Sequence, residues 1–365
     1  MSFEMPRYKA PDFGLDIFRN APDAAMAPAE RDGIVPEGYH STSMFPEYFK
    51  INGRWLLAGE SRMDSCVVYR PESNRLDVVE ARNIKKGDLV LLGRTESGRD
   101  GIFVHANGFA GGEDALEDAF VFRQGRSRET SYSRDYDQLT ELLKYEKQHG
   151  KVVWVMGPTF AFDRDARRAM QAIVENGYVH GLMAGNALAT HDLEGGYLRT
   201  ALGCDIINQK QHFMGHYNHL DTINAINTYG SIPAFIEKEN IQDGIIYNCV
   251  KNNVPFVLNG SIRDDGPLPE VLENNYVGQD TIRSHIRKAT TVIGMATVLH
   301  TIASGNMTPT YRVLGDGTIR PVYFYMVDTS EFAANKLGDR GSLAAKGIVT
   351  NVQDFMRNLS TGLGL

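Results

Sequence analysis

The chain has 365 residues, of which 42% are hydrophobic, and a formal net charge of -7. This length and composition are typical of a globular protein with one large or two ordinary domains, and they exclude general disorder. The negative charge argues against nucleic acid or an anionic membrane surface as a partner, because both bind clustered positive charge. A small cationic or zwitterionic molecule fits better.

The three cysteines, Cys66, Cys204 and Cys249, form no CxxC pair, so we expect neither a disulfide framework nor a zinc site. The opening residues lack the apolar core of a signal peptide. No apolar run approaches the roughly 18 residues that span a bilayer. We therefore expect a cytoplasmic protein without a membrane partner.

The first part of the chain divides into two segments. Residues 1–40 carry five prolines and little periodicity, so we expect an extended arm that lies over the surface or over a neighbouring subunit. Residues 41–135 are expected to form a β-rich subdomain. Between Arg54 and Val104, short apolar runs alternate with Gly, Asn, Ser and Lys, which is typical of antiparallel strands.

Residues 136–365 are expected to form an α/β domain. Helix-like segments such as 137–150 and 165–177 alternate with apolar runs. Strands that alternate with helices predict a parallel sheet with helices on both faces. The strand candidates are residues 151–156, 178–183, 254–258, 291–295, 321–327 and 347–350.

Glycines and polar residues follow these strand candidates. Because the carboxyl ends of parallel strands meet at one edge of a sheet, a ligand is expected there. No GxGxxG opens a helix, so a dinucleotide would use other loops than the usual fingerprint. The residues concerned are Gly157, Pro158, Gly185, Asn186, Ala187, Gly294, Asp328, Thr329 and Ser330.

The segment VPFVLNGSIRDDGPLP (254–269) is the most informative part of the chain. Its apolar run is typical of a buried parallel strand, which would deliver Arg263, Asp264 and Asp265 to the edge of the sheet. Gly260 and Gly266 permit backbone turns that side chains would block. The alternative is an acidic surface turn.

Two residues of AGNALATHDLE (184–194) could contact a dinucleotide. Gly185 would allow close approach of a phosphate or ribose, and Asp192 could bond ribose hydroxyls.

The histidines have more than one interpretation. His191 is either a structural or helix-capping residue, or a proton carrier beside the substrate. His216 and His219 are three residues apart and could share a helix face that binds metal. No HExxH or carboxylate pattern accompanies them, so no metal is expected.

From about Gly53 to its end, the chain resembles the family related to lysine-oxoglutarate reductase and saccharopine dehydrogenase (LOR/SDH). Characterised members include archaeal-type ornithine cyclodeaminases and the C-terminal half of the cyanobacterial arginine dihydrolase/ornithine cyclodeaminase. The resemblance is carried by AGNALATHDLE (184–194), VPFVLNGSIRDDGPLPEV (254–271), LHTIASGNMTP (299–309), NKLGDRGS (335–342) and GIVTNVQDF (347–355).

The resemblance implies a Rossmann-like sheet similar to that of deoxyhypusine synthase, with NAD held across the strand ends of residues 136–365. On that likeness the cofactor contacts are Gly185, Asn186, Asp192, Asp265, Gly266, Thr329, Ser330, Asn351 and Val352. The strand-end residues Gly157, Pro158, Ala187, Gly294 and Asp328, together with Asp339, complete the expected cofactor set.

The activity implied is an NAD-dependent cyclodeaminase, an ammonia-lyase that converts ornithine or a similar basic amino acid to a cyclic product, proline for ornithine. Hydride leaves the α-carbon for the nicotinamide, the terminal amine attacks, ammonia departs and the hydride returns. Arg263 is the candidate for the substrate carboxylate and Asp264 for the terminal ammonium. Lys336, ahead of Lys346, is the candidate acid or base if it is buried, and His191 is a further catalytic candidate.

Two other functions remain open. One is an NAD-dependent amine transferase like deoxyhypusine or homospermidine synthase, and the other is a non-catalytic NAD-binding scaffold. Proteins of this kind often assemble symmetrically, so we expect a homo-oligomer, either a dimer or a tetramer.

Overall fold

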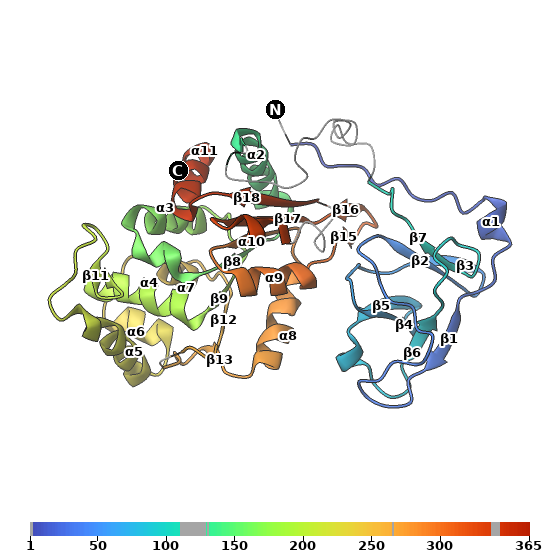
Figure 1. Cartoon of the computed structure of the whole chain (residues 1–365), viewed down its shortest axis with the longest axis horizontal. Coiled ribbons are helices and arrows are strands. Elements are labelled where there is room, and N and C mark those ends of the chain that lie inside the picture. Colours follow the sequence, from blue (N-terminus) through green and yellow to red (C-terminus); the bar gives the residue numbers. More distant parts are fainter. Residues whose placement is uncertain (1–2, 110–128, 130, 265, 337–343) are drawn as a thin grey trace.

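The computed structural model describes residues 3–109, 129, 131–264, 266–336 and 344–365. Figure 1 shows two parts beside one another, a β-rich part from the first third of the chain and an α/β part from the remainder. Within the described residues, no helix has the length and apolar character needed to cross a membrane.

The β-rich part contains two antiparallel sheets, as expected. Its strands are β1 Ala25–Pro28, β2 Glu47–Ile51, β3 Arg54–Leu57, β4 Cys66–Arg70, β5 Arg75–Val79, β6 Leu89–Leu92 and β7 Ile102–Val104, with the short helices α1 Asp16–Arg19 and η1 Ala81–Asn83. The sheet orders are β1-β6-β4-β5 and β3-β2-β7. The segment before residue 40 therefore includes a paired strand, because β1 lies antiparallel to β6. A four-residue edge strand that ends in proline is too short to show a period.

A seven-stranded sheet forms the centre of the α/β part. Its strands are β8 Val152–Met156, β9 Gly181–Gly185, β12 Phe256–Asn259, β13 Val271–Leu272, β14 Thr291–Met295, β17 Tyr323–Asp328 and β18 Ala344–Val349. The order is β13-β12-β9-β8-β14-β17-β18, and every pairing is parallel. Without β13 this is the Rossmann order 3-2-1-4-5-6, in which the chain changes direction between β8 and β14.

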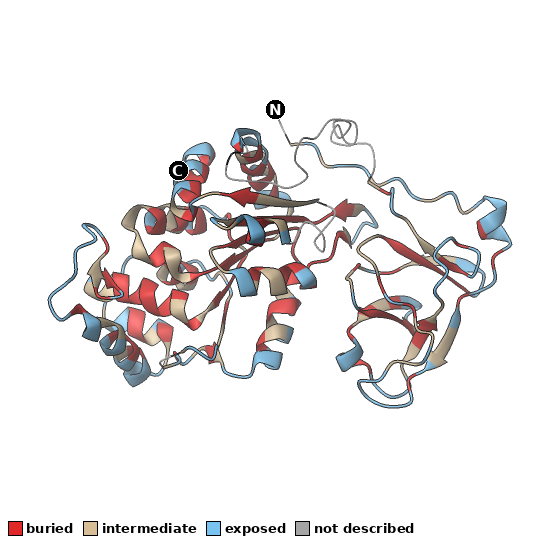
Figure 2. Cartoon of the chain, viewed as in Figure 1, coloured by how far each residue is buried: buried red, intermediate tan, exposed pale blue. Residues whose placement is uncertain are grey.

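Helices cover both faces of this sheet, as predicted. On one face lie α2 Ser133–His149, α3 Arg164–Glu175, α4 Asn186–Leu198, α5 Asn218–Tyr229, α6 Ile232–Lys238, α7 Ile245–Lys251 and α11 Val352–Leu363; α8 Asn275–Ile286 and α9 Val298–Met307 cover the other, and α10 Glu331–Lys336 follows β17. Strand side chains alternate between the two cores: Trp154 packs with the first set and Val153 with the second. Figure 2 shows the resulting buried centre.

The shorter elements are η4 Pro158–Phe162, η5 Gly215–Tyr217, β10 Thr200–Ala201, β11 Cys204–Asp205, β15 Tyr311–Val313 and β16 Ile319–Pro321. The strand predicted at 178–183 begins later, at Gly181. Two residues that were expected to begin this strand, Tyr178 and His180, instead accept hydrogen bonds from residues of β8. The indole N–H of Trp154 donates to the carbonyl of Tyr178 at 3.0 Å, and the N–H of Val152 donates to Nδ1 of His180 at 3.0 Å.

Polar contacts join the two parts. The Tyr311 hydroxyl donates to the carbonyl of Ala58 at 2.5 Å. Arg82 forms an ion pair with Asp280 on α8 at 2.8 Å. These contacts attach the β-rich part to the side of the α/β part that carries α8 and β15.

Candidate functional site

Asn186 connects two of the predicted loops at the strand ends. It follows β9 directly, begins α4 and is 4% exposed. Its side-chain N–H donates to the carbonyl of Gly266 at 3.0 Å, and its side-chain oxygen accepts from the N–H of Leu268 at 3.2 Å. The loop after β12 is therefore held beside Gly185, which brings together two groups of residues that the sequence placed at this edge.

The loop after β12 fixes one carboxylate and exposes one guanidinium. The Asp264 carboxylate accepts from the Ser261 N–H at 2.8 Å and from its hydroxyl at 3.2 Å. The N–H of Arg263 donates to the same hydroxyl at 3.1 Å, while the Arg263 side chain is exposed. Asp264 is thus oriented within its own turn, and Arg263 is accessible to an anionic ligand.

Two helices begin against one another at the strand ends. α4 has 13 residues and α9 has 10, and among the described residues neither N-cap, Gly185 or Thr297, makes a side-chain capping bond. A Cβ on Gly185 would lie 3.2 Å from Cε1 of His300, so the first turn of α9 contacts the start of α4. The two helices follow β9 and β14, the strands on either side of β8, and each directs a positive helix end toward the carboxyl edge of the sheet, which favours an anion there.

His300 was not assigned a role from the sequence, although it lies in the quoted motif 299–309. Burial lowers the pKa of His300, and the nearby charge of Asp264 opposes this shift only in part. The imidazole is therefore neutral near pH 7 and can accept a proton. The signal that could have identified it is a titratable residue three positions after the N-cap of a helix that follows a parallel strand.

The ends of β8 and β14 contact one another through backbone. The Gly157 N–H donates to the Met295 carbonyl at 2.9 Å, and a Cβ on Gly157 would lie 1.9 Å from the Ala296 oxygen. Gly157 is thus required by the contact between two loops. Ala296 has a φ of 54°, a left-handed conformation that costs energy for alanine. Pro158 follows as the first residue of η4.

The ends of β17 and β18 border a cavity of about 370 Å³. Asp328 accepts from the Ser330 N–H at 2.8 Å, and Asn351 caps α11 by accepting from the Gln353 N–H at 2.8 Å. The cavity is lined by Thr329, Val349, Thr350 and Asn351. Two residues of the predicted cofactor set, Thr329 and Asn351, therefore share one hollow.

Asp192 lies away from the strand ends, contrary to the sequence-based expectation. Its carboxylate is fully buried, with one oxygen 2.7 Å from Nε of Arg167 on α3 and the other accepting from the Ile246 N–H at 2.8 Å. Both oxygens are used in binding α3 and α7 to α4. The predicted contact with ribose hydroxyls is replaced by a structural ion pair.

Two further expectations require correction. Gly294 lies inside β14, not in the loop after it, and a Cβ there would be 2.2 Å from the methyl carbon of Thr301. This glycine allows α9 to pack on the strand. Val352 is 4% exposed and belongs to the core under α11.

The remaining members of the expected cofactor set are placed as follows. Ala187 is the partly buried second residue of α4. Asp265 and Asp339 lie outside the described residues.

Lys336 is not near Asp264. It ends α10, is exposed, and its ammonium lies 5.2 Å from the centre of the Phe332 ring. Three strands separate β12 from β17 in the sheet, which places the two strands about 19 Å apart. The burial that an acid–base role for Lys336 requires is absent.

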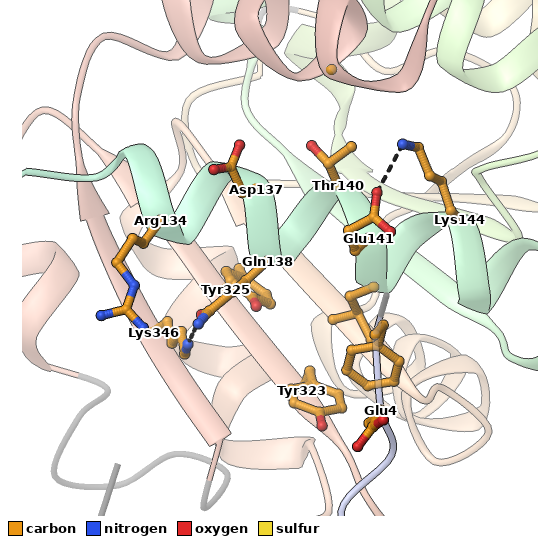
Figure 3. A pocket seen from close by; sticks show the side chains of 13 residues that line it. Glu4, Arg134, Asp137, Gln138, Thr140, Glu141, Lys144, Tyr323, Tyr325 and Lys346 are labelled. Carbon is orange, nitrogen blue, oxygen red and sulfur yellow. Dashed lines mark hydrogen bonds and ion pairs between the residues drawn. The ribbon is translucent and has the colours of Figure 1, made fainter. Parts of the chain in front are cut away.

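Lys346 lies in a larger cavity of about 710 Å³ between α2, the N-terminal segment and β17–β18. Its ammonium donates to the side-chain oxygen of Gln138 at 2.5 Å, as Figure 3 shows. Tyr323, the first residue of β17, also lines this cavity. The cavity is therefore reached from the beginning of the strand and does not belong to the strand-end site.

His191 belongs to a separate cluster on α4. Its Nδ1 lies 3.3 Å from Oε2 of Glu194, and Nδ1 of His219 lies 3.9 Å from the same oxygen. His216 is not among the three grouped residues; its ring contacts that of Tyr217, with centroids 4.2 Å apart. The structure thus joins His219 to His191 and Glu194, and the sequence analysis missed Glu194 because it lies 25 residues before its partner.

Several known proteins are similar to this chain in sequence and in fold. The family described as "Arginine dihydrolase ArgZ-like, C-terminal, Rossmann fold" matches residues 137–359. The chain is 35% identical to an ornithine cyclodeaminase of Methanocaldococcus jannaschii, over 94% of this chain and 78% of that protein. A crystal structure of a conserved LOR/SDH protein from Methanococcus maripaludis superposes with a TM-score of 0.83 at 33% identity, covering 94% of this chain and 98% of that one.

The bifunctional arginine dihydrolase/ornithine cyclodeaminase AgrE of Nostoc is similar over part of its length. Its ternary complex with ornithine and NAD+ has a TM-score of 0.59 at 30% identity, covering 96% of this chain and 47% of that chain. These findings confirm the resemblance predicted from the motifs. The chain belongs to the ArgZ-like C-terminal Rossmann-fold family, together with the archaeal ornithine cyclodeaminases.

Proposed function

We propose that this enzyme is an NAD-dependent cyclodeaminase that converts ornithine, or a similar basic amino acid, to proline or its cyclic counterpart with release of ammonia. The observation that supports this most is the contact of His300, in the first turn of α9, with Gly185, which precedes α4, at the carboxyl edge of a sheet with the Rossmann strand order. A relative that covers nearly the whole chain has been solved with ornithine and NAD+.

The residues at the strand ends fit an NAD molecule. Among the described residues, neither α4 nor α9 has an acidic side chain in its first turn, so a diphosphate there would meet N–H groups. Thr329, Thr350 and Asn351 offer hydroxyl and amide groups to a ribose. When bound, NAD would accept a hydride from the substrate and return it, which keeps the net reaction redox-neutral.

The loop after β12 and the start of α9 supply the groups for the substrate. Arg263 would bind the carboxylate through its planar guanidinium. Asp264, held by Ser261, would receive the terminal ammonium. His300 is neutral near pH 7 because burial lowers its pKa, so it would take the proton that this ammonium must lose before it can attack.

The test is a turnover assay without added nicotinamide. The purified chain is denatured and its supernatant assayed for NAD, and the native chain is then supplied with ornithine, lysine or arginine. We expect bound NAD, and ammonia and proline in equal amounts from ornithine. Absence of NAD together with no ammonia from any of the three amino acids would contradict the proposal.

A variant series separates the residue roles. His300→Gln should lower kcat by about 100-fold or more, the usual contribution of a general base. His149→Gln, an exposed histidine at the end of α2, is the matched control and should leave kcat unchanged. Lys336→Ala should keep most activity, because Lys336 is exposed. Retained NAD with lost turnover in that variant would return the acid–base role to Lys336.

We also propose that the protein is a homo-oligomer, either a dimer or a tetramer. The loop after β12 and the first turns of α9 and α10 expose large apolar side chains: Ile262 is 103% exposed, Leu299 76% and Phe332 70%. A second copy of the chain would remove these side chains from water. Light scattering coupled to size exclusion measures the mass directly, and a monomer at micromolar concentration would contradict this proposal.

A further inference from the structure

We propose that His191, Glu194 and His219 form a binding site for one divalent transition-metal ion, with Zn2+ as the expected ion. The three side chains come from α4 and α5, and their ligand atoms all lie within 4.8 Å of one another. This inference does not rest on the proposed cyclodeaminase activity, because metal binding can be measured without turnover.

Two histidine nitrogens lie near one carboxylate oxygen, at distances that can be compared with those of a zinc site. With zinc–ligand bonds of about 2.0–2.1 Å in a tetrahedron, neighbouring ligand atoms lie about 3.3 Å apart. Oε2 of Glu194 lies 3.3 Å from Nδ1 of His191 and 3.9 Å from Nδ1 of His219. Zinc binding would therefore require Nδ1 of His219, whose side chain is 22% exposed, to approach Oε2 by about 0.6 Å.

Hydrogen bonds to its second oxygen orient the Glu194 carboxylate. The other oxygen of Glu194 accepts from the Thr200 hydroxyl at 2.7 Å and from the Gly203 N–H at 3.4 Å. The Asn218 side chain donates in turn to the Thr200 hydroxyl at 2.9 Å. Ligands of metal ions are commonly held in this way, with one oxygen bound to the protein and the other directed at the ion.

Close backbone packing places α5 beside α4. A Cβ on Gly215 would lie 2.2 Å from the oxygen of Gly203, so only glycine permits the contact between the β10–β11 turn and η5. Because η5 leads directly into α5, this contact places His219 opposite Glu194. The position of the third ligand is therefore determined by the fold.

The charge of the cluster also favours a cation. Glu194 is fully buried, and in the described part of the chain its ion-pair partners are the two histidines alone, without lysine or arginine. A buried carboxylate is costly unless it is paired with positive charge or binds a metal. Two histidines and one carboxylate leave a fourth position for water, the arrangement of open zinc sites.

The test measures metal binding by the full chain, with any affinity tag removed and metal stripped by a chelator. Zn2+ is titrated by calorimetry, and Co2+ is titrated as a probe whose visible absorption reports tetrahedral coordination. We expect about one equivalent per chain. His219→Ala should weaken binding by at least about 100-fold, because it removes a direct ligand.

Glu194→Gln is the second variant, since it keeps the shape of the side chain and the contact with the Thr200 hydroxyl. It should also weaken binding and remove the tetrahedral Co2+ spectrum. His216→Ala removes a neighbouring histidine outside the cluster and should leave both measurements unchanged. Circular dichroism verifies that each variant is folded, and Glu194→Gln is used if His219→Ala is not. Failure of the unmodified chain to bind one equivalent, or equal affinity in the control and the ligand variants, would overturn the proposal.

Discussion

Arg167 provides the most direct test of the fold, because it is buried and binds two carboxylates, the buried one of Asp192 and the half-exposed one of Asp243. Its side chain is 2% exposed. The guanidinium donates to the carboxylates of Asp192 at 2.7 Å and Asp243 at 2.6 Å, and to their backbone carbonyls at 2.9 and 3.1 Å. Replacement by methionine keeps much of the volume and removes all four bonds.

The expected cost follows from what is left behind. Asp192 would stay fully buried, with its carboxylate still accepting from the Ile246 N–H, and an uncompensated buried charge costs about 3–5 kcal/mol. The entropy of unfolding, about 2.1 cal/mol/K per residue, gives about 0.5 kcal/mol/K for residues 136–365. Arg167→Met should therefore lower the Tm of the α/β part by about 6–10 °C.

Differential scanning calorimetry of the purified chain measures this shift. Arg168→Met, at the exposed next position of α3, is the matched control and should change stability by no more than about 0.5 kcal/mol. Adding Asp192→Asn to Arg167→Met removes the buried charge and should restore part of the loss. The reasoning is refuted if Arg167→Met and Arg168→Met melt at the same temperature.

Two further predictions concern pH and packing. Burial lowers the pKa of His180, His285 and His300 below 6.5, so the unfolded chain binds more protons as the pH falls through 6.5 and the free energy of unfolding should decrease. His40 contributes in the opposite direction: burial lowers its pKa, but the hydrogen bond and charge of Glu47 outweigh this and raise it. Urea unfolding at pH 7.5 and 5.5 measures the balance, and greater stability at pH 5.5 would show that the three partly buried histidines do not dominate. Gly294→Ala should destabilise the chain by about 1–3 kcal/mol, since the added methyl group meets α9, while a variant of normal stability that has lost NAD would return this glycine to the cofactor site.

The sequence by itself determined the class of fold and the strand-end edge. Apolar runs alternating with helical periods predict a parallel sheet regardless of how distant segments pack, because each pattern reflects which faces of one element are buried. The loop after β12 could be placed at the edge for the same reason, and Asn186 does hold that loop beside Gly185. The family motifs led to the proposed cofactor and chemistry, which the patterns alone do not specify.

Only the tertiary structure decided which polar residues face the edge and which face the interior. Asp192 and His191 are adjacent on α4, yet a helix turns about 100° per residue, so one contacts Arg167 and the other faces Glu194. The proposed role of His300 depends on its contact with Gly185 at the start of α4, a contact between residues more than 100 positions apart. Such long-range contacts depend on the strand order, which no local pattern in the chain encodes.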